Sequence, residues 1–412
     1  MKICVIGLGY IGLPTAAMFA AHGHTVVGVD KNPAVIDALN QGSIIIEEAH
    51  LDTFVKEVVA KGTLRGSLEP EEAEAFIISV PTPITEEKTA DMSYVQAATE
   101  SIVPYLRKGN LVVLESTSPV GTVEELMAPI LERSGLRVGE DLYLGHSPER
   151  VIPGQILYEL VHNSRIAGGI NPASAEKIAE LYASFVEGEI YPCDARTAEL
   201  CKLTENTFRD VNIAFANELT QICENLGIDV WQVIQLCNKH PRVNIHQPGP
   251  GVGGHCIAVD PWFIVEKQPE TAKLIHQARL INDYMPEYVA AHIYALLEGI
   301  EQPQVTILGI TYKPNVDDTR ESPVLKLAAL LEKNGVAVKL HDPYVKANQG
   351  DLVQACAGSN LVILGVHHQQ YTQLPAKEML AAMSGNLFYD TRNFVDEPTL
   401  TAAGFAVYSL GR

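Results

Sequence analysis

A glycine-rich turn between an apolar segment and a helical pattern constrains the fold of this chain more than any other feature. The hydrophobic pattern predicts a strand over residues 2–6, a helix that ends near residue 22, and a second strand over residues 25–30. The turn after the first strand, residues 7–12 (GLGYIG), fits the pattern G-x-G-x-x-G. A strand, a crossover helix and a second strand form a βαβ unit, so we expect the chain to begin with a parallel sheet.

The same turn suits the binding of a dinucleotide. Glycines at this spacing let a pyrophosphate approach the backbone at the N-terminus of the helix. Asp30 lies 18 residues after Gly12, at the end of the second predicted strand, where its carboxylate can accept hydrogen bonds from the adenine ribose. Because this carboxylate would repel the extra phosphate of NADP, the pattern favours NAD. The alternatives are a chance glycine turn in another α/β protein and, for Asp30 alone, a solvated strand end.

Strands and helices alternate at both ends of the chain and enclose a helical middle. Apolar runs predict strands over 75–80, 111–115, 142–145, 305–310, 337–341, 361–366 and 387–390, and helical patterns cover 94–106, 197–226, 230–238 and 271–297. A chain of 412 residues is too long for one hydrophobic core. We therefore expect an α/β protein with two Rossmann-like, doubly wound domains joined by a helical middle that contains a long central helix. The expected domain bounds are 1–196, 197–297 and 298–412.

Composition narrows the class of protein. The chain carries 30 Lys and Arg against 50 Asp and Glu, a formal net charge of −20, which argues against binding to nucleic acid or to a membrane. A few local basic side chains can still hold a phosphate-bearing small molecule. The seven cysteines are odd in number and include no C-x-x-C pair, so we expect reduced thiols, no metal site and a cytoplasmic location.

A second glycine-rich turn presents a cysteine. The segment 250–256 (PGVGGHC) surrounds Cys256 with little side-chain bulk, so we expect its thiol to be accessible. The other six cysteines lie mostly in apolar or helical surroundings, where a buried, inert thiol is the default interpretation. Cys256 is therefore the candidate nucleophile, with an inert thiol as the alternative. Asp260 lies four residues further on and can serve as a base or cap a helix or turn.

Further candidate catalytic residues lie in the predicted central helix and at the edge of the first sheet. Lys202 and Asn206 are four residues apart in the helix, so both project from one face and could bind a developing oxyanion. The alternative for Lys202 is a solvated helix face. Glu149 follows the strand predicted over 142–145, at the sheet edge where α/β enzymes hold their ligands. A functional carboxylate and a salt bridge are equally supported at this position.

Basic residues recur in the helical middle and the last domain. They would suit a diphosphate if the fold brings them together, and are surface charges if it does not. The residues concerned are Arg209, His240, Arg242, Lys313, Arg320 and Arg392.

Several motifs occur together, in order, along nearly the whole chain. They are VIGLGYIGLP at 5–14, ESTSPVG at 115–121, SPER at 147–150, KLTEN at 202–206, GGHC at 253–256, YKPN at 312–315 and DTRESP at 318–323. On these motifs the chain resembles the UDP-glucose and GDP-mannose dehydrogenase family. The segment 239–244 (KHPRVN) resembles the version found in the members that act on UDP-N-acetyl-D-mannosamine.

The resemblance implies an N-terminal NAD domain, a central helix used in dimerisation and a C-terminal domain that holds the UDP moiety. The expected partners are therefore a UDP-sugar substrate and a second copy of the chain, in a pathway of surface polysaccharide synthesis. The residues expected to contact NAD are Gly7, Gly9, Tyr10, Ile11, Gly12, Asp30, Thr82, Thr117 and Arg320. Those expected to line the sugar-nucleotide site are Arg150, Val151, Lys202, Asn206, Arg209, His240, Arg242, Gly253, Tyr312, Lys313 and Arg392.

The implied reaction is a two-step oxidation of the sugar C6 alcohol to a carboxylate. Lys202 and Asn206 would steady the reacting oxygen, and the thiolate of Cys256 would attack the aldehyde to form a thiohemiacetal and then a thioester. Glu149 or Asp260 would activate the hydrolytic water. The alternatives are the same chemistry on UDP-N-acetylglucosamine, UDP-glucose or GDP-mannose, a one-step hydroxyacid dehydrogenase without need of a cysteine, and a nucleotide sensor that binds NAD without turnover.

Overall fold

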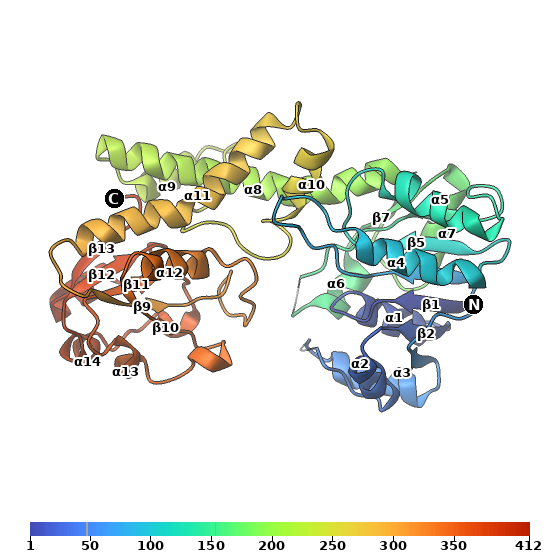
Figure 1. Cartoon of the computed structure of the whole chain (residues 1–412), viewed down its shortest axis with the longest axis horizontal. Coiled ribbons are helices and arrows are strands. Elements are labelled where there is room, and N and C mark those ends of the chain that lie inside the picture. The colour runs from blue at the N-terminus through green and yellow to red at the C-terminus, as the bar shows by residue number, and fades with distance from the viewer. Residues whose placement is uncertain (47, 153) are drawn as a thin grey trace. The chain divides into compact units, whose positions relative to one another are not determined.

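The computed structural model describes residues 1–46, 48–152 and 154–412. Contacts divide the chain into two compact units, Met1–Glu205 and Asn206–Arg412, with the boundary inside the long helix α8 (Ala195–Leu226). Each unit contains one sheet with helices on both faces (Figure 1), which confirms the predicted pair of doubly wound α/β domains. The division into three domains at 1–196, 197–297 and 298–412 stays a prediction.

The first unit has the strand order of a dinucleotide-binding fold. Its sheet runs β3-β2-β1-β4-β5-β6-β7-β8, and its pairs are parallel except for the antiparallel pair β6–β7. The strands are β1 (Lys2–Ile6), β2 (Thr25–Val29), β3 (Leu64–Ser67), β4 (Ala75–Ile78), β5 (Leu111–Leu114), β6 (Tyr143–His146), β7 (Arg165–Gly169) and β8 (Ile190–Asp194). The helices before α8 are α1 (Gly12–Ala21), α2 (Pro33–Asn40), α3 (Leu51–Ala60), α4 (Ser93–Ile102), α5 (Ala128–Leu131), α6 (Ile156–His162) and α7 (Pro172–Tyr182).

Alternation along β1 shows why its residues form a central strand. Ile3 and Val5 pack into the core on one face of the sheet, together with α1, while Cys4 and Ile6 pack into the core on the other face. A strand that is buried on both faces needs apolar residues at every buried position, which is the pattern of residues 3–6 of β1. The glycine turn after β1 is therefore held at the carboxyl edge of a rigid sheet.

The second unit begins within α8 and ends in a smaller parallel sheet of order β10-β9-β11-β12-β13. Its strands are β9 (Gln304–Leu308), β10 (Ala337–His341), β11 (Leu361–Leu364), β12 (Leu387–Asp390) and β13 (Ala406–Ser409). Its helices after α8 are α9 (Val230–Cys237), α10 (Asp260–Lys267), α11 (Lys273–Leu296), α12 (Pro323–Lys333), α13 (Leu352–Cys356), α14 (Ala376–Ala382) and α15 (Glu397–Ala403). Helices α11 and α12 pack on one face of this sheet, and α13, α14 and α15 pack on the other.

The sequence did not predict the strands β3, β7, β8 and β13. Three of them, β3, β8 and β13, lie at sheet edges and are largely half-buried or exposed, so they lack the continuous apolar run of a central strand. Strand β7 reads RIAGG, and its two glycines carry no strand pattern.

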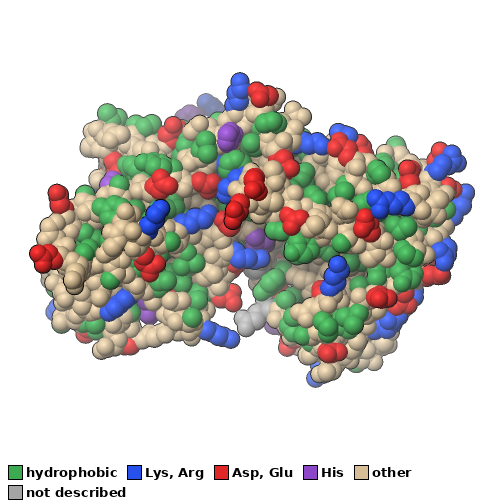
Figure 2. Space-filling model, in the orientation of Figure 1, with side chains coloured by type: hydrophobic (Ala, Val, Ile, Leu, Met, Phe, Trp, Pro, Cys, Tyr) green, Lys and Arg blue, Asp and Glu red, His purple; other side chains and the backbone are tan. Residues whose placement is uncertain are grey.

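The surface mixes charges of both signs. Figure 2 shows acidic and basic side chains interspersed over the visible face, with hydrophobic side chains between them. Within the described ranges, every helix is either too short or too polar to span a bilayer.

Candidate functional site

The glycine turn after β1 forms a cradle at the N-terminus of α1. The backbone N–H of Leu8 donates to Asp30 Oδ2 (3.0 Å), and that of Asn32 donates to Asp30 Oδ1 (2.9 Å). Asp30 is half-buried directly after β2, so its carboxylate is fixed beside the turn and still reaches the surface. In the described residues, no side chain makes a capping hydrogen bond at the N-cap residue of α1, Ile11, so this helix terminus is not blocked by a side chain.

The three glycines of the turn differ in the space that a side chain would have at each position. A Cβ on Gly7, which has φ +94°, would lie 2.3 Å from the carbonyl oxygen of Ser79, and a Cβ on Gly12 would lie 1.9 Å from the carbonyl oxygen of Gly7. These two positions exclude any side chain. Gly9 faces open space, because no heavy atom of the described chain lies within 4 Å of the place that a Cβ would take. A backbone cradle with one open side and a nearby carboxylate fits the pyrophosphate and ribose of NAD.

Two predicted NAD contacts follow neighbouring strands at the same edge. Thr82 comes after β4 and Thr117 comes after β5, and these strands pair in parallel beside β1. Both threonines are half-buried. Because carboxyl ends of parallel strands meet at one edge, the structure places Thr82 and Thr117 at the edge that carries the glycine turn. The ninth predicted NAD residue, Arg320, belongs to the second unit.

Glu149 lies in a buried ion-pair cluster. Its Oε2 forms an ion pair with Arg165 NH1 (2.8 Å), and the side chains of Glu149 and Arg165 are 8% and 5% exposed. The same guanidinium pairs with Glu115 Oε1 (2.8 Å), donates to Ser147 Oγ (2.9 Å) and lies 3.8 Å from the ring centroid of Tyr182. The salt bridge that the sequence left open for Glu149 is therefore present, while its catalytic role stays a prediction.

The cluster contains two carboxylates and one guanidinium. Tyr182 donates its hydroxyl to Glu115 Oε1 (2.7 Å). Burial raises the pKa of Glu115 to about 7, and the charge of Arg165 opposes this rise while that of Glu149 adds to it. Neither Glu115 nor Arg165 was predicted from the sequence as a functional residue. Glu115 could have been found as a carboxylate directly after the buried strand β5, but Arg165 opens the unpredicted strand β7.

Lys202 lies near the carboxyl end of β6. His146 ends this strand and is fully buried, and burial lowers its pKa to about 3, with the charge of Lys202 lowering it further. His146 is therefore neutral at pH 7 and does not compete with Lys202 as a cation.

The turn that carries Cys256 is held against the second sheet. A Cβ on Gly253 would lie 2.9 Å from Tyr312 Cβ, and a Cβ on Gly254, which has φ +85°, would lie 2.8 Å from the Tyr312 ring. A Cβ on Gly249 would lie 2.2 Å from Arg392 NH1. These glycines let the backbone approach two predicted substrate residues closely, and Cys256 itself is half-exposed.

Two of the predicted catalytic residues are in direct contact in the second unit. Asn206 Nδ2 donates to Asp260 Oδ2 (2.6 Å), and both side chains are buried. Asp260 is the first residue of α10, and its backbone N–H donates to the carbonyl of Cys256 (2.8 Å). A side-chain amide has two N–H groups, so Asn206 keeps one donor for a reacting oxygen. Asn206, Asp260 and Cys256 therefore form one group.

Charged and polar residues surround the thiol turn. Arg320 forms a bidentate pair with Asp318 (2.7 and 3.0 Å), and this hydrogen bonding, together with the charge of Cys256, raises the pKa of Arg320. Burial raises the pKa of Tyr312, and Arg209 and Arg320 oppose the rise. The structure thus brings Arg209 near Tyr312 and brings Tyr312 and Arg320 near Cys256, and Lys313 Nζ lies 5.7 Å from the Tyr312 ring centroid.

Other predicted substrate residues lie elsewhere. His240 and Arg242 are exposed on the loop between α9 and α10, where the backbone N–H of Arg242 donates to His240 Nδ1 (3.3 Å). In the first unit, Arg150 forms an ion pair with Glu205 (2.9 Å), and Val151 packs against the core. These four assignments stay predictions.

The surroundings of the other cysteines disfavour thiolates at most positions. Burial raises the pKa of Cys4 to about 11, that of Cys193 to about 11 and that of Cys356 to about 12, and it also raises that of Cys223. Only the thiolate is a good nucleophile. Cys256 lies instead near a guanidinium on a half-exposed turn, which favours its candidacy.

Three family models match consecutive parts of the chain. The NAD-binding domain of the UDP-glucose/GDP-mannose dehydrogenase family matches residues 1–186, the central domain of that family matches 196–284, and its UDP-binding domain matches 306–397.

Similar proteins match this chain over nearly its full length. A UDP-N-acetyl-D-mannosamine dehydrogenase of Methanococcus maripaludis strain C7 is 46% identical over 422 residues, covering 100% of this chain and 97% of the relative. An NDP-N-acetyl-D-galactosaminuronic acid dehydrogenase of Ralstonia solanacearum is 45% identical, with 97% of each chain covered. The solved structure of a UDP-D-ManNAc dehydrogenase from Pyrococcus horikoshii superposes with a TM-score of 0.94 at 41% identity, covering 100% of this chain and 99% of that one.

Proposed function

Because this chain belongs to the UDP-glucose/GDP-mannose dehydrogenase family, we propose that it oxidises the C6 alcohol of UDP-N-acetyl-D-mannosamine to the carboxylate of UDP-N-acetyl-D-mannosaminuronate. The protein is an NAD-dependent nucleotide-sugar dehydrogenase. The names of the Methanococcus and Pyrococcus relatives support the choice of sugar. The Ralstonia relative, at nearly the same identity, favours an N-acetylgalactosamine configuration as the second candidate.

The position of Cys256 carries the proposal of a double oxidation. The thiol of Cys256 is half-exposed and lies on a glycine-rich turn, near the guanidinium of Arg320 and beside the Asn206–Asp260 pair. A nearby cation favours the thiolate, which can hold an aldehyde covalently. A dehydrogenase that stops at the aldehyde or ketone has no use for such a thiol.

In the proposed reaction, each of two oxidations removes two electrons from C6. The first converts the alcohol to an aldehyde, and the thiolate of Cys256 then adds to the aldehyde carbon to give a thiohemiacetal. The second oxidation converts this adduct to a thioester, and water releases the carboxylate and restores the thiol. NAD, when bound, supplies the hydride acceptor for both oxidations.

The chain's own residues take the remaining roles. Lys202 and Asn206 stabilise the negative charge that develops on the C6 oxygen. Asp260 or Glu149 accepts a proton from the hydrolytic water, and the buried ion pair with Arg165 orients Glu149 for this role. NAD is assigned to Gly7, Gly9, Tyr10, Ile11, Gly12, Asp30, Thr82, Thr117 and Arg320.

The nucleotide sugar is assigned to the basic and aromatic residues. Arg side chains bind diphosphates with two parallel N–H donors, which suits Arg209 and Arg392 near the thiol turn. The complete assignment is Arg150, Val151, Lys202, Asn206, Arg209, His240, Arg242, Gly253, Tyr312, Lys313 and Arg392.

We also propose that the protein is a homodimer through α8. Phe208, Phe215, Ile222 and Leu226 are 65%, 48%, 46% and 66% exposed, and their spacing places them on one face of the helix. Such an apolar stripe on a long helix suits burial against a second copy. Sedimentation velocity tests this: the native chain should be a dimer and Phe215→Glu a monomer, and a monomeric native chain would rule the dimer out.

The experiment that tests the reaction counts NADH formed per sugar consumed. The purified chain is offered UDP-N-acetylmannosamine, UDP-N-acetylgalactosamine, UDP-N-acetylglucosamine, UDP-glucose and GDP-mannose in separate assays. Cys256→Ala is run beside Cys237→Ala, which removes an exposed cysteine outside the thiol turn. Two NADH per sugar, lost only in Cys256→Ala, supports the thioester route and identifies the sugar. One NADH per sugar with Cys256→Ala unimpaired favours a one-step dehydrogenase, and absence of turnover with every sugar favours a sensor.

A further inference from the structure

In each unit, the same local arrangement follows the first strand of the sheet in chain order. In the first, Gly7 (φ +94°) follows β1, and the N–H of the next residue donates to Asp30 Oδ2 (3.0 Å) at the end of the neighbouring strand. In the second, Gly309 (φ +81°) follows β9, and the N–H of the next residue donates to Asp342 Oδ2 (2.8 Å) after β10. In a dinucleotide-binding unit, the carboxylate at this place receives ribose hydroxyls. Asp342 is therefore the second unit's counterpart of Asp30.

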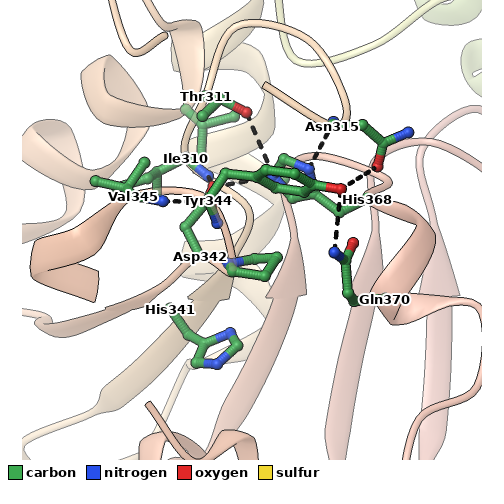
Figure 3. A network of polar contacts seen from close by, with 12 residues as sticks. Ile310, Thr311, Asn315, His341, Asp342, Tyr344, Val345, His368 and Gln370 are labelled. Carbon is green, nitrogen blue, oxygen red and sulfur yellow. Dashed lines mark hydrogen bonds and ion pairs between the residues drawn. The ribbon is translucent and has the colours of Figure 1, made fainter. Parts of the chain in front are cut away.

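The two carboxylates differ in what they face. Asp30 is half-buried, whereas Asp342 and His368 are both completely buried and His368 Nε2 lies 2.9 Å from Asp342 Oδ2. The backbone N–H of Asn315 donates to His368 Nδ1 (2.9 Å). Because a backbone N–H can only donate, Nδ1 accepts and the neutral ring carries its proton on Nε2, which donates to Asp342. His368 thus donates to Asp342 in the place where a ribose hydroxyl would donate to the corresponding carboxylate of a dinucleotide-binding unit. Figure 3 shows His368 beside Asp342.

The pair anchors the loop that follows β9. His368 reaches Thr311 at the start of this loop (3.3 Å), and Thr311 Oγ1 donates to the carbonyl of Lys313 (2.8 Å). Asn315 has φ +61°, in the left-handed region that non-glycine residues seldom adopt and that asparagine adopts more readily than most. Its Oδ1 accepts from the backbone N–H of Gln369 (2.9 Å) and from the hydroxyl of Tyr344 (3.3 Å), as Figure 3 shows for Tyr344.

The far part of the same loop, residues 311–322, contacts the thiol turn. The N–H of Gly254 donates to the carbonyl of Arg320 (3.0 Å), and the ring of Tyr312 packs against the Gly254 backbone. The N–H of Tyr312 donates to the carbonyl of Asp318 (3.0 Å), which closes the loop on itself. The loop therefore connects the buried pair at its base to the turn that carries Cys256.

We propose that His368, paired with Asp342, is a positioning residue for the chemistry of Cys256. It touches neither substrate nor thiol. It fills, from within the protein, the place of a bound ribose, and so holds loop 311–322 in the geometry that sets Tyr312 and Arg320 against the thiol turn. This inference rests on the proposed function for the role of Cys256.

The test compares His368→Ala, His368→Gln and the matched control His341→Gln. A glutamine at 368 can donate to Asp342 and accept from the Asn315 N–H, so it should restore the geometry. His341 is also buried and bonded, to Tyr371 (2.9 Å) and to the Gly350 carbonyl (3.2 Å), but its ring does not contact loop 311–322 in the described structure. The readouts are amide hydrogen exchange of residues 311–322, kcat and KM with UDP-N-acetylmannosamine and NAD, and the rate of Cys256 alkylation by iodoacetamide.

In His368→Ala we expect loop exchange to rise by about tenfold or more, because the loop loses its anchor. We expect kcat to fall by about tenfold to a hundredfold, because small misplacements near the reacting atoms have effects of this size, while KM for NAD changes by less than about twofold. His368→Gln should recover most of kcat. An unchanged kcat in His368→Ala, or an equal loss in His341→Gln, would overturn the proposal.

The rate of Cys256 alkylation tests the positioning role of His368 independently of the proposed function. If the native chain oxidises none of the nucleotide sugars, the proposed function fails, but the labelling rate of Cys256 needs no substrate. A change of about threefold or more in His368→Ala, absent in His341→Gln, then supports the positioning role. Equal labelling rates in all variants would refute it.

Discussion

Glu115→Gln removes a buried carboxylate whose ionisation opposes folding. In the native chain, burial raises the pKa of Glu115 from 4.5 to about 7, despite the nearby Arg165. The folded state therefore keeps a proton that the unfolded state has lost between these values, so stability falls as pH rises through this window and levels off above it. A span of about 2.5 units at about 1.4 kcal/mol per unit corresponds to about 3.5 kcal/mol in total, of which about 3 kcal/mol is lost between about pH 4.5 and about pH 8. Glutamine keeps an oxygen that can accept from Arg165 and Tyr182 but does not titrate.

The assay is urea unfolding followed by circular dichroism at several pH values from about 4.5 to about 8. Relative to Glu115→Gln, the native chain should lose about 3 kcal/mol of unfolding free energy across this range. The matched control is Glu124→Gln, which removes a half-exposed carboxylate paired with Arg196 and should parallel the native profile, because surface pairs contribute little. If the native and Glu115→Gln profiles run parallel, folding does not shift the pKa of Glu115, and the argument that burial outweighs Arg165 is wrong.

Three further substitutions test the two glycine turns and the buried cluster. Arg165→Met should lower the unfolding free energy by about 3–5 kcal/mol at neutral pH, because buried carboxylates lose their cation, and an unchanged urea midpoint would contradict this. Gly9→Ala should keep the fold but weaken NAD binding by about tenfold or more in a fluorescence titration, since its methyl enters the open side of the cradle; equal affinity would exclude that cradle as the cofactor site. Gly249→Ala should displace Arg392 and raise KM for the nucleotide sugar about tenfold in steady-state kinetics, whereas Gly350→Ala, which faces open space, should not, and equal KM values would refute the argument.

Much of the fold could be predicted because its signals are local. Strand β10 has the predicted bounds 337–341, and α8 extends the predicted helix 197–226 by two residues at its start. Central strands are buried on both faces and so must be apolar throughout, which makes them visible in a sequence. Edge strands such as β8 need not be, and β8 was missed.

The candidate site was predictable in its residue types and less so in its pairings. The glycine turns at 7–12 and 250–256 and the carboxylate of Asp30 follow from local spacing. The sequence left Glu149 undecided between a salt bridge and a function, and it gave no indication of its partner Arg165. The contact between Asn206 and Asp260 was equally invisible, because the two residues are far apart along the chain.

The sequence alone determined the parallel α/β class, the preference for NAD, the candidate thiol and the family. Each of these depends on backbone conformation and residue spacing within a short segment, where covalent geometry and burial pattern leave few choices. Only the tertiary structure decided that Glu115 and Glu149 both pair with Arg165, and that His368 contacts the carboxylate of Asp342. Such pairs join residues that lie in or directly after different strands of a sheet, and they depend on the order of the strands, which no local pattern encodes.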